Sequence, residues 1–288
     1  MKRLIGLSLL LIFFLPTMSA AQQAKVFTGS KIIPISGEPI DNGVLVTKGD
    51  KIFAVGSKGE VEIPSNARTF DVSGKVIMPG LVDSHSHIGD GDGGDRSAAL
   101  HPDARIIDSI DPHSETFKKA LAGGVTTVNV MPGSGHLMSG QTAYLKLRNA
   151  DKIEEMLFVD DPQNEIAGGL KMANGTNSIG NPPFPGTRAK SASMVRELFI
   201  KAQDYKEKVE EANGDPEKMP TRNVGMDALV EVLNGERIVH YHTHRHYDIL
   251  TAIRLAEEFG FRVVLHHVSE AWKIADEIAE ADVPASII

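Results

Sequence analysis

The pattern of hydrophobic and polar residues changes once along the chain, close to residue 79. Up to that point, short runs rich in β-branched residues alternate with turns such as Asp41-Asn42-Gly43 and Lys48-Gly49-Asp50. Runs of this length, bounded by Gly and Asp, are typical of short strands joined by tight turns. The pattern predicts a small all-β unit over residues 22–78.

Beyond residue 79, strand-like runs alternate with helix-like stretches. Within residues 191–213, for example, the apolar residues Val195, Leu198, Phe199 and Ala202 recur at spacings of three and four, as one buried helix face requires. The alternation of strands and helices predicts an α/β fold with a parallel sheet. The expected strands are residues 81–85, 126–131, 167–172, 237–242 and 261–266, and the expected helices are residues 114–122, 191–213, 247–259 and 270–281.

Polar residues at the carboxyl ends of these strands are typical of a TIM-type (β/α)8 barrel, which has its active site there. The sequence offers five clear strands, a weaker candidate at residues 156–159 and the start of another at residues 284–288. A closed barrel needs eight strands. We therefore expect residues 79–288 to form an incomplete barrel that stops before strand 8.

The first 21 residues have the order of a secretory signal peptide. Lys2 and Arg3 precede an apolar run over residues 4–15, and small residues follow at Ser19-Ala20-Ala21. The run is shorter than the roughly 20 residues of a membrane-spanning helix, which is the alternative interpretation. We expect cleavage before Gln22, a secreted or periplasmic location, and no membrane anchor after cleavage.

Composition excludes some classes of protein. The chain contains no cysteine, so its stability must come from a large core without disulfides. Its net charge is −8, and removal of Lys2 and Arg3 with the signal peptide would make it −10. An acidic protein without a basic stripe is a poor nucleic-acid binder. The expected partners are a small-molecule substrate and, in a homo-oligomer, further copies of the chain.

The strongest chemical signal is Asp83-Ser84-His85-Ser86-His87, at the end of an apolar strand. Residues two apart on a strand point to the same side, so the two imidazoles can bind one metal ion. Two solvated loop histidines are the alternative interpretation. The apolar strand before the pair and the glycine-rich stretch after it favour metal ligands, with Asp83 as a partner for an imidazole N–H.

Residues 76–87, Val-Ile-Met-Pro-Gly-Leu-Val-Asp-Ser-His-Ser-His, closely resemble the first strand motif of the amidohydrolase superfamily, in particular the branch related to imidazolonepropionases. The resemblance covers residues 25–288, and it implies that the unit of residues 22–78 is the N-terminal part of a composite β-sandwich that strands from the C-terminus complete. It implies a metal-dependent hydrolase that acts on carbon–nitrogen bonds, with one or two divalent ions, Zn²⁺ by preference. It also implies a general-base aspartate on strand 8, which we expect beyond Ile288. We therefore expect activity from a longer protein and not from this stretch alone.

The resemblance also implies further metal ligands from later strands. Lys171, in Gly169-Leu170-Lys171-Met172-Ala173, corresponds to a lysine that is carbamylated in phosphotriesterase-like members and bridges two metals. A surface or salt-bridged lysine is the alternative. His242 in the tract 240–246 and His267 in the pair His266-His267 match the ligands of strands 5 and 6. Adjacent strand residues face opposite ways, so only one histidine of that pair should reach the metal.

Three further residues are candidates for substrate binding. His244 follows His242 at the strand end, His136 lies in a glycine-rich stretch after the second strand, and Arg188 follows a proline-rich loop. The forked donors of an arginine suit a substrate carboxylate, although Arg188 can equally cap nearby carbonyls. Two other functions remain open: phosphotriester or lactone hydrolysis, which the Lys171 pattern permits, and non-catalytic metal binding by the histidines.

Overall fold

The computed structural model describes residues 23–159, 161 and 165–287, so the expected signal peptide lies outside the described residues. The chain divides after Pro79 into two compact units. No helix in the described part of the chain is long and apolar enough to cross a membrane.

The first unit is built on one mixed five-stranded sheet. Its core consists of Ala24, Val26, Val44 and Val46, which are almost completely buried. The sheet has the order β3-β2-β1-β4, and β5 also pairs with β1. A sandwich needs a second sheet, and residues 23–79 supply one sheet only. The strands are β1 (Lys25–Ile32), β2 (Ile40–Lys48), β3 (Lys51–Ser57), β4 (Arg68–Asp71) and β5 (Val76–Ile77).

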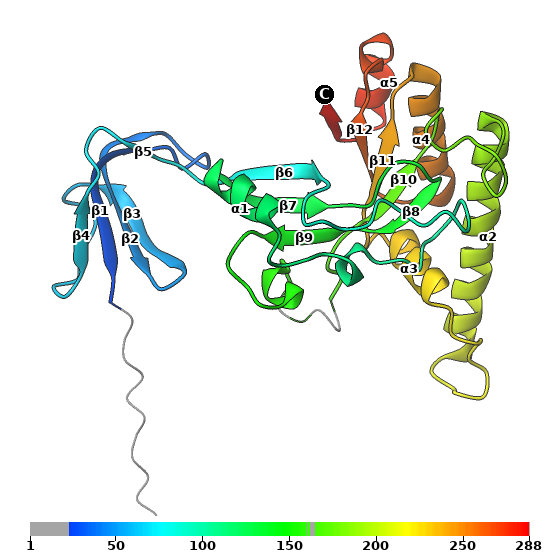
Figure 1. Ribbon diagram of the computed structural model, residues 1–288, viewed down its shortest axis with the longest axis horizontal. Helices are drawn as coiled ribbons and strands as arrows, with labels where there is room; N and C mark the ends of the chain where they lie inside the picture. The colour runs from blue at the N-terminus through cyan, green and yellow to red at the C-terminus, as the bar shows by residue number, and fades with distance from the viewer. Residues whose placement is uncertain (1–22, 160, 162–164, 288) are drawn as a thin grey trace, which may run out of the picture. The chain divides into compact units, whose positions relative to one another are not determined.

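The second unit contains two open sheets (Figure 1). One has the order β13-β12-β11-β10-β8 and is parallel except for β8, and the other has the order β6-β7-β9. Backbone hydrogen bonds from Thr142 to Gly169 and from Tyr144 to Ala167 connect the two sheets. The strands are β6 (Leu81–Ser86), β7 (Val125–Val130), β8 (Met138–Gln141), β9 (Ala143–Lys146), β10 (Leu170–Ala173), β11 (Val239–Thr243), β12 (Val263–His267) and β13 (Ala285–Ile287).

Helices cover one face of the larger sheet (Figure 1). The ring of Phe199 stacks on the rings of Phe259 and Phe261, with centroids 5.1 Å apart in both pairs, and this contact fixes α2 against α4. The helix α4 ends at Gly260, whose φ of +72° is a left-handed conformation that glycine adopts without a steric penalty. The helices are α1 (Glu115–Ala122), α2 (Arg188–Ala212), α3 (Val224–Leu233), α4 (His246–Phe259) and α5 (Ala275–Glu280).

The five expected strands after residue 79 all form, and so does the start of a further strand at residues 285–287. The weaker candidate at residues 156–159 was wrong. Residues 153–156 form a single turn of 3-10 helix, and Leu157 makes only one isolated bridge, to Leu145. This segment packs its apolar side chains into a second core with β7 and β9, which a compact turn achieves as well as a strand does.

Candidate metal centre

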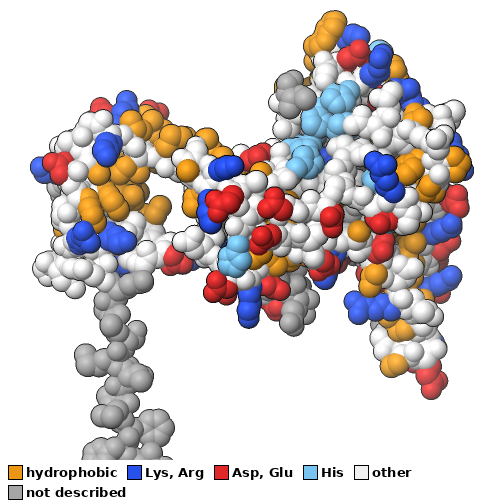
Figure 2. All heavy atoms as spheres, in the orientation of Figure 1, with side chains coloured by type: hydrophobic (Ala, Val, Ile, Leu, Met, Phe, Trp, Pro, Cys, Tyr) orange, Lys and Arg blue, Asp and Glu red, His pale blue; other side chains and the backbone are white. Residues whose placement is uncertain are grey.

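Strands of both sheets in the second unit bring the candidate ligands together. His85 lies in β6 and His87 directly after it, Lys171 lies in β10, His242 lies near the end of β11, and His267 ends β12. Parallel strands present their carboxyl ends at one edge of a sheet, where α/β proteins place their sites. Histidine side chains gather in one patch on this unit (Figure 2).

His85, His87 and Lys171 form one set of donors. Nε2 of His85 lies 3.2 Å from Nε2 of His87 and 3.4 Å from Nζ of Lys171. Nδ1 of His87 lies 2.8 Å from the carbonyl oxygen of Met131. Because a carbonyl oxygen can only accept, Nδ1 of His87 carries a proton, and in the neutral ring Nε2 is the atom with the lone pair. This carbonyl orients the ring as the outer partner of a metal-bound histidine does.

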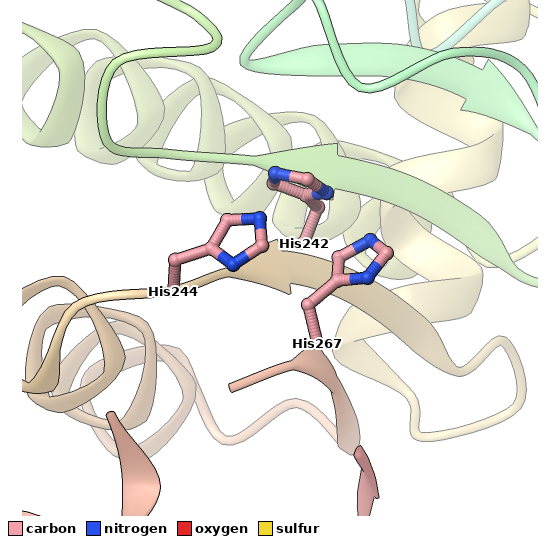
Figure 3. Close-up of side chains that lie close together, drawn as sticks. All are labelled: His242, His244 and His267. Carbon is pink, nitrogen blue, oxygen red and sulfur yellow. The ribbon is translucent and has the colours of Figure 1, made fainter. Parts of the chain in front are cut away.

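A second set consists of His242, His244 and His267, whose side chains converge from the end of β11, the residue after it and the end of β12 (Figure 3). One ring nitrogen from each lies within 4.8 Å of the other two. The ring centroids of His242 and His267 are 4.3 Å apart, and that of His267 is 4.6 Å from His85. The two sets are therefore neighbours.

The backbone at the end of β12 explains how His267 reaches this cluster. In the register of the sheet, His242 pairs with His266, so strand alternation would turn His267 to the opposite face. His267 instead has a φ of +74° and Val268 a φ of +40°. Positive φ is rare for residues other than glycine and is costly for a β-branched side chain. The unusual backbone bends the chain and directs the His267 ring to the cluster.

The charge state of the cluster suits a cation. Burial, and then the neighbouring charge of Lys171, lowers the pKa of His85 to about 2. Burial and the facing His267 lower the pKa of His242 to about 3, and burial and Lys171 lower that of His267 to about 4. Burial alone lowers the pKa of Lys171 to about 7. At neutral pH these imidazoles carry lone pairs and no charge, which is the state that binds metal.

Unpaired buried nitrogens support the same conclusion. Both ring nitrogens of His242, and Nδ1 of His85 and of His267, are buried and have no hydrogen-bond partner among the described residues. A buried polar atom without a partner costs on the order of 1–3 kcal/mol, so native proteins usually fill such sites with water or an ion. These residues therefore fit a divalent metal ion.

His266 belongs to a neighbouring hydrogen-bond network with His240 and Asn129. Nδ2 of Asn129 lies 3.2 Å from the carbonyl oxygen of Ser84 and 3.1 Å from Nε2 of His240. The carbonyl oxygen of Ser84 can only accept, so Nδ2 of Asn129 is the amide nitrogen and donates to it. We assign the contact of the same nitrogen with Nε2 of His240 as a second donated hydrogen bond. His240 then carries its proton on Nδ1 and donates to Nε2 of His266, 3.0 Å away. The hydroxyl of Tyr144 also lies 2.9 Å from Nε2 of His240.

Nδ1 of His266 is itself buried without a hydrogen-bond partner among the described residues, and the His266 ring lies 4.7 Å from the ring of His85. The pKa of His266 is lowered to about 3 by burial and then by His240, and the side chain is fully buried. Of the adjacent pair, His267 is the one with a ring nitrogen within 4.8 Å of ring nitrogens of His242 and His244. Sequence reasoning identified neither Asn129 nor Tyr144, because no local motif marks them.

Three side chains singled out in the sequence have other partners. Arg188 donates to the buried carboxylate of Asp248, with 2.9 Å between Nε and Oδ1, and so is engaged away from the cluster. His136 is buried beside His101 and Phe184, with ring centroids 5.9 and 5.1 Å away. The carboxylate of Asp83 accepts from the backbone N–H of His85, and not from an imidazole. His85 is only two residues beyond Asp83, so its backbone N–H lies close to the Asp83 carboxylate.

The fold and the site define a mixed α/β protein with imidazole and lysine donors gathered at strand ends. An amidohydrolase from Thermotoga maritima MSB8 has a similar structure, with a TM-score of 0.83 and 33% identity, over 92% of this chain and 70% of that one. The amidohydrolase tasK of Hapsidospora irregularis is 24% identical over 291 residues, 87% of this chain and 29% of that protein. An imidazolonepropionase of Fusobacterium nucleatum subsp. nucleatum is 41% identical over 121 residues, 33% of this chain and 29% of that enzyme.

No protein-family model matches the chain. The similarity to the Thermotoga protein nevertheless extends over most of both chains, and the chain belongs to the amidohydrolase superfamily. The resemblance seen in the sequence is thereby confirmed. Enzymes of this superfamily generally depend on metal and have a TIM-barrel-like fold. The chain spans about 29% of the length of the curated relatives it matches first.

Proposed function

We propose that the whole protein is a metal-dependent hydrolase that cleaves a carbon–nitrogen bond in a cyclic amide or a small peptide-like substrate. The observation that carries the proposal is the convergence of His85, His87 and Lys171 on one point, beside the ring of His267. The names of the relatives, amidohydrolase and imidazolonepropionase, support the same class of reaction. We also propose that residues 80–287 are part of a (β/α)8 barrel in the whole protein.

The proposed ligands are His85, His87, Lys171, His242 and His267, and the proposed ion is Zn²⁺. Nitrogen donors of this kind suit zinc and similar transition metals more than Mg²⁺ or Ca²⁺. A bound divalent ion supplies Lewis acidity, which polarises a carbonyl group and makes water more acidic. The chain itself orients the donors: the carbonyl of Met131 aims His87, and the positive φ at His267 aims its ring.

Lys171 has the properties that carbamylation needs. Its side chain is fully buried, and its pKa of about 7 leaves a substantial neutral fraction at neutral pH. A neutral amine can attack CO2, which forms an N–C bond, releases one proton and leaves a carbamate anion. A carbamate offers two anionic oxygens to a cation, whereas an ammonium offers none. We propose that Lys171 acts in this form.

Other features of the sequence support the proposed location and substrate class. The order of charged, apolar and small residues over positions 2–21 supports secretion or a periplasmic location. The acidic net charge supports a small-molecule substrate over nucleic acid.

The test uses the full-length protein, with bound metal measured by elemental analysis. We expect one to two equivalents of zinc, and hydrolysis of at least one member of a panel of dipeptides and cyclic amides. His85→Ala should lose both metal and turnover, whereas His113→Ala, which removes an exposed histidine in the loop before α1, should change neither. A folded protein without stoichiometric metal would contradict the proposal. Metal without any turnover would instead favour a non-catalytic metal-binding protein.

A further inference from the structure

The helices α2 and α4 lie side by side and are joined by two ion pairs (Figure 1). Nε of Arg188, at the start of α2, lies 2.9 Å from Oδ1 of Asp248, and Nε of Arg196 lies 2.7 Å from Oε2 of Glu258. The two pairs follow one another in the same order on both helices, so α2 and α4 run in the same direction. A groove of about 360 Å³ lies between them.

Arg254 lines this groove on α4, between the two ion pairs. It is six residues beyond Asp248 and four residues before Glu258. Its Nη2 donates to the hydroxyl oxygen of Thr251 at 2.8 Å, and it forms no ion pair with any residue that the structure describes. On α2, small side chains leave room between the helices: Ala189, Ser191 and Ala192.

The two paired arginines also keep donors for a ligand. Arg188 and Arg196 each pair through Nε, and their Nη atoms have no hydrogen-bond partner within the described ranges of the chain. A guanidinium group has five N–H donors in a planar fork, so four remain on each side chain. The guanidinium carbon of Arg188 lies 5.2 Å from the ring centre of Tyr247, which helps to hold it in place.

The groove is locally positive on an acidic protein. Its lining contains three arginines and one acid, Asp248, which is buried and already paired with Arg188. A second open pocket, beside α3, is different, because there three arginines meet four acids. Its buried Arg237 is occupied by the carboxylate of Glu231 and the carbonyl oxygen of Gly168. Only the groove between α2 and α4 thus combines an excess of arginines with unused N–H donors.

This groove is separate from the candidate metal centre. Tyr241 lines the groove, whereas its neighbour His242 in β11 belongs to the metal centre. Adjacent residues of a strand point to opposite faces, so the groove lies on the helix side of β11. A ligand there therefore contacts the guanidinium groups and not the candidate metal ligands.

We propose that the groove between α2 and α4 binds a small molecule with a dianionic oxyanion group, either a phosphate or a pair of carboxylates, and that Arg254 is its central contact. The forked donors of arginine match the oxygens of both groups. Small-molecule pockets typically measure about 300–1,000 Å³, so the groove also has room for an organic group beside the oxyanion. This binding site goes beyond the proposed hydrolase and does not depend on it.

The test is isothermal titration calorimetry of the metal-loaded, full-length protein with inorganic phosphate and, separately, with succinate. We expect one equivalent whose affinity falls as NaCl is added. Arg254→Ala should weaken that equivalent at least about tenfold, through the loss of charge-assisted hydrogen bonds. Arg254→Lys should weaken it less, because it keeps the charge and loses only the fork. The anion that binds more tightly identifies the group as phosphate or carboxylate.

Arg222→Ala is the matched control, because Arg222 is an exposed arginine outside the groove that also pairs through Nε, with Asp227. Its affinity for both anions should equal that of the wild type. His85→Ala should keep the same equivalent, since the groove is separate from the metal centre. Thermal unfolding shows that each variant folds, and Arg254 is exposed, so its replacement leaves the core intact.

Two results would overturn the proposed groove site. One is an affinity of Arg254→Ala equal to that of the wild type, or no binding of either anion. The other is anion binding that disappears in His85→Ala and persists in Arg254→Ala, because the anion would then be bound at the metal centre. In both cases the proposed hydrolase would stand.

Discussion

A single amide side chain, Asn129, determines the direction of the buried hydrogen bonds behind the candidate ligands. Its Nδ2 lies 3.2 Å from the carbonyl oxygen of Ser84 and 3.1 Å from Nε2 of His240, and as a donor to both it assigns the proton of His240 to Nδ1, which faces His266. In a buried network, one donor of known direction assigns every following proton. Which nitrogen of a histidine is protonated determines which one can accept a hydrogen bond or bind a metal ion.

This assignment makes a spectroscopic prediction. Nitrogen-15 NMR of histidine rings should show His240 and His266 as the tautomers protonated on Nδ1. Asn129→Asp should move the proton of His240 to Nε2, because a carboxylate only accepts. Tyr144→Phe is the control and should leave the tautomer unchanged, since Asn129 still donates. Protonation of His240 on Nε2 in the wild type would refute the assigned direction.

The same buried histidines make stability depend on pH. His240, His242 and His266 are at most 6% exposed, and burial lowers their pKa values to about 4, 3 and 3. An unfolded histidine titrates near 6.5. As the pH falls below 6.5, the unfolded chain therefore takes up protons that the folded chain does not, and the folded state loses stability down to pH 4.

The expected loss is roughly 1.4 kcal/mol per pH unit for each histidine that stays neutral in the folded protein. Urea unfolding of the metal-free protein at pH 7.5, 6 and 5 measures it. A free energy of unfolding that does not change over this range would show that these rings are charged or exposed.

At the scale of elements, the packing of α2 holds the helical layer against the sheet. Phe199 is fully buried and stacks on Phe259 and Phe261, whereas its neighbour Ile200 is 51% exposed. Phe199→Ala should lower the free energy of unfolding by about 3–5 kcal/mol through lost burial and a cavity. Ile200→Ala should change it by less than about 0.5 kcal/mol. Equal effects in thermal unfolding would mean that α2 does not pack as described.

Some elements could be predicted from the sequence and others could not. The strand that carries His85 and the helix α4 follow from apolar periodicity, which reflects local geometry. The strand β8 (Met138–Gln141) lies in a glycine- and serine-rich stretch, and only its pairing with β10 makes it a strand. The helix α3 was missed because it is short and follows a polar stretch with Gly214, Asp215 and Pro216, although Asn223 caps it.

At the scale of the whole molecule, metal binding should couple to the stability of one unit. All candidate ligands lie in the unit beyond residue 79, and none lies in the first unit. Zinc at about 100 times its dissociation constant adds about 2.7 kcal/mol per site to the unit that binds it. Calorimetry with and without a chelator should therefore move the unfolding transition of that unit only. A parallel shift of both transitions would place metal outside the proposed site.

The sequence by itself determined the residue types, their spacing along strands and the family they belong to, because these are properties of local geometry and chemistry. From these, five candidate ligands could be named: His85, His87, Lys171, His242 and His267. Only the tertiary structure decided which ring nitrogens lie close together. It turned His267 inward through two residues with positive φ, engaged Arg188 with Asp248, and brought His244 beside His267. Those outcomes depend on strand register and on loops far apart in the chain, which no local pattern encodes.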